Sequence, residues 1–346
     1  MLPVEIPFPP MEARAALKLP AGAGWQYEPK WDGFRCLAFR DGARVELTSK
    51  AEKPLTRYFP ELVAALTALR PQRFVLDGEL VVPSAEGVSF DALLQRIHPA
   101  ASRVARLARE TPAIFVAFDL LVDERGRSLL DVPLAERRSA LEAFAARHLR
   151  GHAALHLSPR TDDLETARRW THELEGGLDG VIAKRLDASY EPGERSGAMR
   201  KIKSLRSADC VVGGFRYRSD DPGTVGSLLL GLYDADGLLH HVGFTSSLDA
   251  AARREVTPRL ERRIEPPGFT GGAPGGPSRW TRGRSTEWQP LRPELVVEVQ
   301  YDHFTGGRFR HGTKLLRWRP DKAPRQCTLE QVAQEARSPL DLLETR

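Results

Sequence analysis

The sequence predicts an α+β protein of two domains, a mixed domain over residues 1–204 and a small strand-rich domain over residues 205–346. Asp-Gly pairs at positions 41–42 and 236–237 separate apolar alternating runs, which predicts antiparallel hairpins. Other segments carry apolar residues at helical spacing. After position 205 the pattern changes to several short strands and one helix, which is typical of a small β-barrel.

The first domain is expected to begin with residues 1–24, which are rich in proline, alanine and glycine and wrap the surface ahead of a strand through Lys30. Apolar runs predict further strands at residues 34–40, 44–49, 73–82, 114–122, 181–183 and 200–203. Helical periodicity predicts helices at residues 61–69, 134–148 and 162–174, the last capped by Thr161 or Asp162.

The second domain is expected to contain five strands and one helix. The strands are predicted at residues 210–217, 227–233, 238–244, 294–301 and 314–318. The helix is predicted near residues 248–263, and a loop rich in glycine and proline follows at residues 266–277.

Composition excludes several classes of protein. Charged residues make up 28 % and hydrophobic residues 41 % of the chain, which is ordinary for a globular protein. No apolar run is long enough for a membrane helix, and the N-terminus lacks a basic segment followed by an apolar one. Three scattered cysteines (36, 210 and 327) offer neither a disulfide framework nor a metal-ligand spacing. We therefore expect a cytoplasmic protein, whose net charge of +5 permits a polyanionic partner.

The stretch EPKWDGFR at positions 28–35 is the most distinctive part of the chain. In extended chain, alternation points Glu28, Lys30 and Asp32 towards one face. A catalytic lysine needs its charge tuned by neighbours before it can act as a nucleophile. Gly33 permits close approach of a ligand, and Arg35 supplies a forked donor for phosphate. Taken alone, the stretch also fits a surface lysine between two acids.

Two further apolar runs contain carboxylates. Asp77, Gly78 and Glu79 divide residues 73–82 into an apparent pair of strands, and Asp119 lies inside residues 114–122. Buried acids are costly unless they are paired or bind a metal, so both places are candidate sites. A tight Asp-Gly turn is the alternative for the first. Phe118 fits either a platform for a flat base or an ordinary core residue.

Lysines follow two short extended segments. The segment DGVIAK at positions 179–184 runs from an acid through an apolar strand to Lys184, which alternation places opposite its apolar neighbours. Lys201 and Lys203 share one face of the next segment, where two lysines repel each other unless an anion lies between them. A solvated edge strand is the alternative.

Together these residues suit phosphoryl or nucleotidyl transfer, in which catalysis is mainly positioning and charge neutralisation. Lys30 is the candidate nucleophile. The acids predicted to hold a divalent metal are Asp32, Glu79 and Asp179, and the lysines predicted to hold phosphate are Lys184, Lys201 and Lys203. The chain has no Walker-type or dinucleotide-binding glycine loop, which argues against P-loop and Rossmann chemistry.

The order of these motifs resembles that of the covalent nucleotidyltransferases, the superfamily of ATP-dependent DNA ligases, RNA ligases and mRNA-capping guanylyltransferases. The motifs are KxDGxR from Lys30, DGE from Asp77, FD from Phe118, DGVIAK from Asp179 and KxK from Lys201. The chain looks most like the small two-domain bacterial ATP-dependent DNA ligases of repair. PPM at positions 9–11, YxxGxR at 190–195 and RPDK at 319–322 add support.

The resemblance implies a nucleotidyltransferase (adenylation) domain of antiparallel sheets with flanking helices, followed by an OB-fold β-barrel. Lys30 would carry AMP taken from ATP, with Mg²⁺ or Mn²⁺ as the metal. Glu28 would contact the adenine, Phe118 would stack on it, and Lys201 and Lys203 would grip the α-phosphate. The complete set of implied nucleotide-binding residues is Glu28, Lys30, Arg35, Lys50, Glu79, Phe118, Lys184, Lys201, Lys203, Arg319 and Lys322.

Within that set, Arg35 and Glu79 match positions that hold ribose and phosphate. Late residues of the barrel, with Arg319, Asp321 and Lys322 as candidates, would orient the pyrophosphate. The chain departs from many members of the superfamily in two places. Asp179 stands where glutamate is common at the metal, and Lys50 stands where arginine is common, which keeps the charge but loses the fork.

The resemblance implies a monomeric enzyme whose partners are nicked double-stranded DNA and other DNA-repair proteins, and which binds no membrane. We expect no additional DNA-binding domain ahead of Lys30, so the barrel would grip DNA. Residues 279–325 contain eleven Lys or Arg against five Asp or Glu. Aromatic residues lie among these charges, namely Trp280, Trp288, Tyr301, Phe304, Phe309 and Trp318. The alternatives are an RNA ligase or capping-type enzyme, and a non-catalytic nucleic-acid-binding relative.

Overall fold

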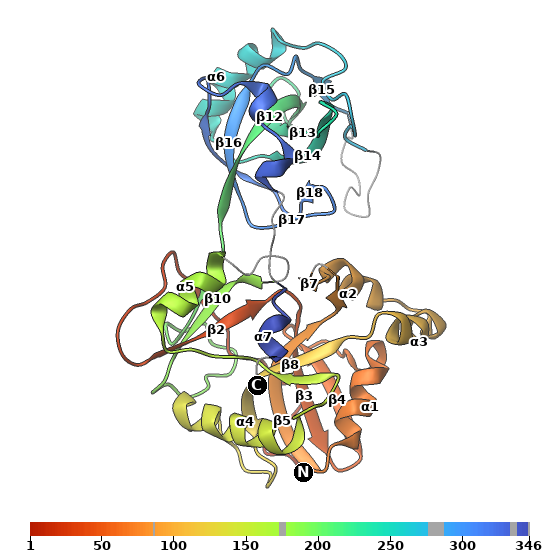
Figure 1. Ribbon diagram of the computed structural model, residues 1–346, viewed down its shortest axis with the longest axis vertical. Coiled ribbons are helices and arrows are strands. Elements are labelled where there is room, and N and C mark those ends of the chain that lie inside the picture. Colours follow the sequence, from red (N-terminus) through yellow and green to blue (C-terminus); the bar gives the residue numbers. More distant parts are fainter. Residues whose placement is uncertain (86, 173–177, 276–286, 333–337, 345–346) are drawn as a thin grey trace. The chain divides into compact units, whose positions relative to one another are not determined.

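The computed structural model describes residues 1–85, 87–172, 178–275, 287–332 and 338–344 (Figure 1). The chain forms two compact units. Met1–Ser204 and Ala336–Arg346 make up the first unit, and Leu205–Glu335 makes up the second. None of the described helices combines the length and the hydrophobicity needed to cross a membrane.

A five-stranded sheet forms the centre of the first unit, in the order β4-β3-β5-β8-β9. Its strands are β3 (Phe34–Asp41), β4 (Arg44–Ser49), β5 (Arg73–Val81), β8 (Ile114–Val122) and β9 (Leu155–Leu157). All neighbours are antiparallel except β8 and β9. The predicted hairpin turn joins β3 to β4, and Gly42 adopts there a positive φ of 62° that favours glycine.

A second sheet of the first unit brings together segments far apart in the sequence, in the order β1-β11-β10-β2. Its strands are β1 (Arg14–Ala15), β2 (Trp25–Trp31), β10 (Leu178–Arg185) and β11 (Met199–Ile202). Gly180 has a φ of 113°, and a Cβ there would lie 2.0 Å from the carbonyl oxygen of Ile202. Only glycine therefore allows β10 and β11 to approach beside Asp179.

Helices flank the sheets of the first unit (Figure 1). They are α1 (Pro60–Ala68), α2 (Phe90–Arg96), α3 (Ala101–Glu110), α4 (Leu134–His148), α5 (Leu164–His172) and α7 (Asp341–Glu344). α4 packs on β8, and α5 packs on β2 and β10. The sequence analysis missed α2 and α3, and it misplaced the cap of α5: Asp163, not Thr161 or Asp162, accepts from the amide of Thr166 at 2.9 Å. A short hairpin, β6 (Pro83–Ser84) and β7 (Gly87–Val88), precedes α2.

Neither the strand pair nor the tight turn considered for Asp77-Gly78-Glu79 occurs, because β5 runs through all three residues. Gly78 is needed for packing: a Cβ there would lie 2.5 Å from the ring of Phe115. A register shift in the pairing of β5 with β8 falls between Asp77 and Gly78. The strand therefore carries two acids into the interior without breaking.

The second unit is a curled antiparallel sheet in the order β14-β13-β12-β16-β19, with β15 paired to β12. Its strands are β12 (Arg206–Tyr217), β13 (Val225–Tyr233), β14 (Leu239–Thr245), β15 (Gln289–Pro290), β16 (Val296–Tyr301) and β19 (Lys314–Trp318). A hairpin of β17 (Phe304–Thr305) and β18 (Arg308–Phe309) precedes β19, and α6 (Ala250–Glu261) packs on β13. Among the described residues a single bridge, Thr245 to Thr313, links the two ends of the sheet, so the barrel is open.

The C-terminal residues correct the predicted domain organisation. The sequence analysis assigned residues 336–346 to the barrel, whereas the described part of this segment, residues 338–344, belongs to the first unit. Leu340, Leu342 and Leu343 pack against a core cluster of that unit that includes Trp25 and Trp170. Burial of these leucines against aromatic residues, rather than their proximity in sequence to the barrel, decides where the segment docks.

Candidate active site

A cavity of about 440 Å³ opens in the first unit between its two sheets. Its lining comes from β2, β3, β5, β8, β10 and β11, together with the segments around Glu12 and Lys50. Eight of the eleven predicted nucleotide-binding residues line it: Glu28, Lys30, Arg35, Lys50, Glu79, Phe118, Lys184 and Lys201. The volume is in the range of small-molecule sites.

The side chain of Lys30 is held by a carboxylate from the neighbouring strand. Its Nζ donates to Oδ2 of Asp179 at 2.6 Å, and Nζ of Lys203 lies 3.5 Å from Oδ1 of the same carboxylate. Lys30 and Asp179 are both largely shielded from solvent, with side chains 25 % and 11 % exposed. At Gly33, just after Lys30, a Cβ would lie 2.1 Å from the carbonyl oxygen of Leu80, which explains the glycine of the motif.

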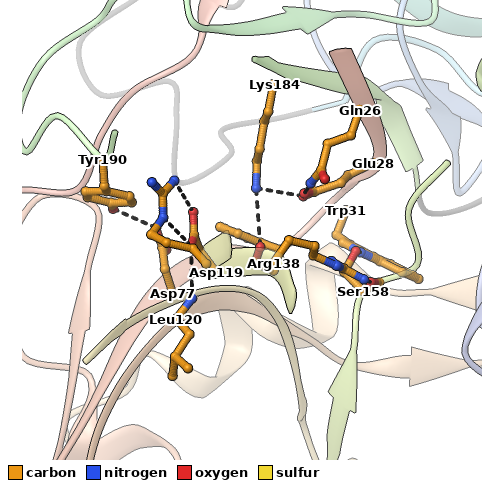
Figure 2. A network of polar contacts seen from close by, with 12 residues as sticks. Gln26, Glu28, Trp31, Asp77, Asp119, Leu120, Arg138, Ser158, Lys184 and Tyr190 are labelled. Carbon is orange, nitrogen blue, oxygen red and sulfur yellow. Dashed lines mark hydrogen bonds and ion pairs between the residues drawn. The ribbon is translucent and has the colours of Figure 1, made fainter. Parts of the chain in front are cut away.

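A buried ion pair lies deeper in the cavity (Figure 2). Nζ of Lys184 lies 2.8 Å from Oε2 of Glu28, and both side chains are under a tenth exposed. Nε2 of Gln26 donates to the other carboxylate oxygen of Glu28 at 2.6 Å. Lys184 also lies 4.7 Å from the ring centroid of Phe118. Alternation along β10 thus places Lys184 in the cavity, as predicted, while Val181 and Ala183 face the core.

Phe118 lines the cavity, and two cations lie over its ring, Nζ of Lys184 and the guanidinium of Arg35, the latter 5.5 Å from the ring centroid. Both carboxylate oxygens of Asp77 accept from Arg35, at 3.0 and 2.6 Å, and Oδ2 also accepts from the hydroxyl of Tyr190 at 2.7 Å. Burial alone would lower the pKa of Arg35, but the charges of Asp77, Tyr190 and Glu79 and the hydrogen bonds to Asp77 together raise it. Nε and Nη2 of Arg35 are therefore occupied by Asp77, and these two hydrogen bonds hold the side chain in place.

Asp119 has the partner that its position in an apolar strand required. Nε and Nη2 of Arg137, on α4, donate to its two oxygens at 3.0 and 3.1 Å. Burial alone would raise the pKa of Asp119, but the charge of Arg137 and its hydrogen bonds lower it. The guanidinium of Arg137 also lies over the ring of Tyr190, 5.6 Å from its centroid. Arg137 therefore connects its own ion pair with Asp119 to the hydrogen bond between Tyr190 and Asp77.

Glu79 has a different environment. Burial raises its pKa to about 8, and the positive charges of Lys30 and Arg35 only partly offset this effect. Among the described residues, none forms a hydrogen bond or ion pair with its carboxylate. Glu79 therefore lines the cavity as an acid whose charge lacks a direct counter-ion.

Basic side chains gather at the mouth of the cavity. Burial and the charges of Lys50, Lys30, Arg195 and Lys203 lower the pKa of Lys201. Glu12 interrupts this group, since its carboxylate accepts from Nε of Arg195 at 3.0 Å and lies 3.1 Å from Nζ of Lys50. An excess of cations around one space is the arrangement that polyphosphate binding requires.

Comparison with known families decides the assignment. Residues 10–203 match the family model described as "ATP dependent DNA ligase domain", and residues 221–322 match "ATP dependent DNA ligase C terminal region". The first match alone covers more than half of the chain. The chain belongs to the ATP-dependent DNA ligases.

Two relatives of this ligase are similar over nearly their full length. DNA ligase C2 of Mycolicibacterium smegmatis is 49 % identical over 350 residues, which cover 96 % of each chain. DNA ligase C of Mycobacterium tuberculosis is 46 % identical over 349 residues, which cover 96 % of this chain and 95 % of that one. The protein is therefore an enzyme, a DNA ligase that uses ATP.

A solved structure from work titled "DNA binding with a minimal scaffold: Structure-function analysis of Lig E DNA ligases" covers 90 % of this chain and 99 % of its own. Its TM-score is 0.53 and its sequence identity 17 %, so it supports the fold alone. The predicted α+β fold, an adenylation domain followed by an OB-fold domain, is thereby confirmed.

The predicted metal set of this ligase does not assemble as expected. Among the described residues, no three His, Cys, Asp or Glu side chains gather as metal ligands. β2 ends at Trp31, so Asp32 lies beyond the strand and outside the cavity lining, and Asp179 is paired with lysines. Alternation failed for Asp32 because the strand ends one residue before it.

The barrel residues of this ligase also need correction. Tyr301 and Phe309 are buried in the barrel core, so they do not belong to the predicted aromatic surface, whereas Trp288, Phe304 and Trp318 pack against that core and stay partly exposed. Trp280 lies outside the described residues. Arg319 donates to Asp209 at 2.8 Å and to Asp321, and Nζ of Lys322 lies 3.6 Å from Asp209. These two predicted nucleotide-binding residues belong to the second unit.

Sequence reasoning missed five residues of the site. Glu12 and Gln26 bind its charged side chains, Tyr190 supports Asp77, and Ile182 and Met199 give the cavity an apolar wall. Alternation in β10 would have identified Ile182, two positions from Lys184. Tyr190 begins the YxxGxR motif, which the sequence analysis noted without giving the tyrosine a role. Glu12, Gln26 and Met199 depend on contacts between distant segments and carried no local signal.

Proposed function

We propose that this ligase seals 5′-phosphate/3′-hydroxyl nicks in duplex DNA through AMP carried on Lys30, and that it serves DNA repair. The observation that supports the catalytic role most directly is the position of Lys30, inside the cavity and 2.6 Å from Asp179. A carboxylate at this distance both holds the amine in place and is a ready acceptor for its proton.

The reaction consists of three transfers. Lys30 Nζ, after loss of its proton, bonds to the α-phosphorus of ATP while the bond to the β-phosphate breaks, and pyrophosphate leaves. The AMP group then passes from Lys30 to the 5′-phosphate at the nick. The 3′-hydroxyl finally attacks that phosphate, which joins the strands and releases AMP.

The remaining cavity residues would bind the nucleotide. Phe118 would stack on the adenine, and Glu28, fixed by Gln26 and Lys184, would contact its edge. Lys201 and Lys203 would hold the α-phosphate, and Lys184 and Lys50 would add positive charge. Arg35 and Glu79 would bind ribose and phosphate from β3 and β5, and the barrel residues Arg319 and Lys322 would orient the pyrophosphate.

Asp179 and Glu79 are the residues that would hold Mg²⁺ or Mn²⁺. Mg²⁺ is usually bound by one or two carboxylates together with substrate phosphates, so two acids suffice. The raised pKa of Glu79 fits this role, since a divalent cation would supply the counter-charge that the protein lacks there. The metal would neutralise phosphate charge and act as a Lewis acid.

Nicked DNA would bind largely through the barrel, and its binding should weaken steeply as salt rises. Such a substrate places the enzyme with the nucleoid in the cytoplasm. We propose that it acts there as a monomer, together with other repair proteins. An RNA ligase or capping-type activity is the second candidate. Comparing the sealing rates of an all-DNA nick and an RNA-containing nick separates these functions.

The decisive experiment is incubation with α-labelled ATP and Mg²⁺, followed by denaturing electrophoresis. After stripping with pyrophosphate, the wild type should take up label and Lys30→Ala should not. Lys53→Ala, which removes an exposed lysine, is the matched control and should label normally. Absence of label on the stripped wild type would overturn the proposal in favour of a non-catalytic nucleic-acid-binding protein.

A further inference from the structure

Three basic side chains of the second unit have no acidic partner among the residues that the structure describes. Nη2 of Arg308, on β18, lies 3.3 Å from Nδ1 of His241, on β14, where β18 packs against β14. Burial lowers the pKa of Arg216, on β12, and the positive charge of Arg308 adds to this effect. No hydrogen bond or ion pair joins either arginine to a carboxylate within the described residues.

This arrangement costs free energy. Two guanidinium groups repel each other, and the Nε of Arg216 is buried without an acceptor. His241 is only 8 % exposed, and its Nε2 also lacks a hydrogen-bond partner among the described residues. Two exposed arginines of the same unit are neutralised locally, Arg218 by Asp220 and Arg292 by Glu265.

The local structure holds the group in place. Gly306 and Gly307 adopt positive φ values that turn the β17–β18 hairpin, and Phe309 packs so closely that a Cβ at Gly243 would lie 3.0 Å from its ring. His241 accepts from Arg308, which requires a neutral ring. Burial, followed by the charges of Arg308 and Arg216, lowers the pKa of His241 to about 4, so the ring is neutral at physiological pH.

We propose that Arg216 and Arg308, with His241 as a positioning residue, form an anion site on the barrel that takes a phosphate group of a nucleic-acid backbone. A phosphodiester would supply the negative charge and acceptor oxygens that the two arginines lack within the protein. The assignment of this phosphate to DNA rests on the proposed function, because a free phosphate ion has the same charge and acceptor oxygens.

The first test measures binding of a nicked duplex over a series of salt concentrations. Arg216→Gln/Arg308→Gln should weaken binding and reduce the slope of log K against log salt by about 1, the value for one lost phosphate contact. Arg292→Gln/Arg218→Gln removes the same charge from paired arginines and should change the slope less. Without DNA, the first variant should be at least as stable as the wild type because repulsion is relieved.

The second test distinguishes the source of the phosphate. Inorganic phosphate is titrated while the His241 ring is followed by NMR in the wild type and in the Arg216→Gln/Arg308→Gln variant. A wild-type shift that the variant lacks, with salt slopes equal in all variants, would support the site but assign it to a free anion. No shift, together with equal slopes, would overturn the proposal. Labelling of Lys30 by ATP tests the proposed function separately. If labelling failed, the phosphate titration would still show whether the arginines bind an anion.

Discussion

Nζ of Lys30 and Oδ2 of Asp179 lie 2.6 Å apart, although 149 positions separate these residues in the sequence. The pairing of β2 with β10 brings them together, and Gly180 allows the end of β11, which Lys203 follows, to approach beside the same carboxylate. Asp179 is thus the residue on which the two lysines at the candidate reaction centre converge. It both limits the movement of Lys30 and offsets the repulsion between Lys30 and Lys203.

Substitution of Asp179 by Asn should slow the transfer of AMP to Lys30 by roughly 10²-fold, the usual effect of removing one electrostatic group from an active site. The rate of label uptake from α-labelled ATP measures this effect. Asp187→Asn removes an acid that pairs with Arg185 in an exposed position and serves as the control. Equal labelling rates for the wild type and Asp179→Asn would show that the ion pair has no catalytic role.

Replacement of Lys184 by Met should destabilise the first unit by about 3–5 kcal/mol, because Glu28 would remain buried without its cation. Urea denaturation measures the free energy of unfolding. The double variant Glu28→Gln/Lys184→Met removes both charges and should recover most of the loss. If the double variant were no more stable than Lys184→Met, packing rather than charge would be the cause.

The stability of the ligand-free protein should fall as pH rises from about 4.5 to about 8, in so far as Glu79 controls it. Burial raises the pKa of this acid from its usual 4.5 to about 8, so the folded state binds the proton more tightly than the unfolded state. The contribution of Glu79 to stability is fully present below its pKa in the unfolded state, about 4.5, and is lost as the pH rises through its pKa in the folded state, about 8. Glu79→Gln should flatten this part of the profile of urea midpoint against pH, and a Glu79→Gln profile parallel to that of the wild type would contradict the assignment.

Loss of the C-terminal contacts should destabilise the first unit and leave the barrel unchanged. Substitution of Leu340, Leu342 and Leu343 by Ala removes apolar area packed against the Trp25 and Trp170 cluster, with an expected cost of about 2–4 kcal/mol. Hydrogen exchange should show faster amide exchange in β2 and α5. Leu17→Ala, at a leucine that is 95 % exposed, is the control. Faster exchange in the barrel instead would show that these leucines belong to it.

Local sequence signals were sufficient for the elements with strong periodicity. The bounds of β8 and α4 agree with prediction at both ends. α3 was missed although its amphipathic pattern is stronger than that of α4: Val104 and Leu107 are buried among arginines, and the helix packs on α1. The continuity of β5 through Asp77 was also missed, since the ion pair that makes a buried acid tolerable there comes from Arg35 on another strand.

The sequence by itself determined the family, the order of the nucleotide-binding motifs and the identity of Lys30 as candidate nucleophile. Those features are local patterns of residue type, which a chain displays whether or not it is folded. Only the tertiary structure decided that Asp179 binds two lysines, that Glu79 lacks a counter-ion, and that the C-terminal leucines return to the first unit. Such relationships depend on which distant surfaces are buried together, and burial sets both the cost of a charge and the value of an apolar contact.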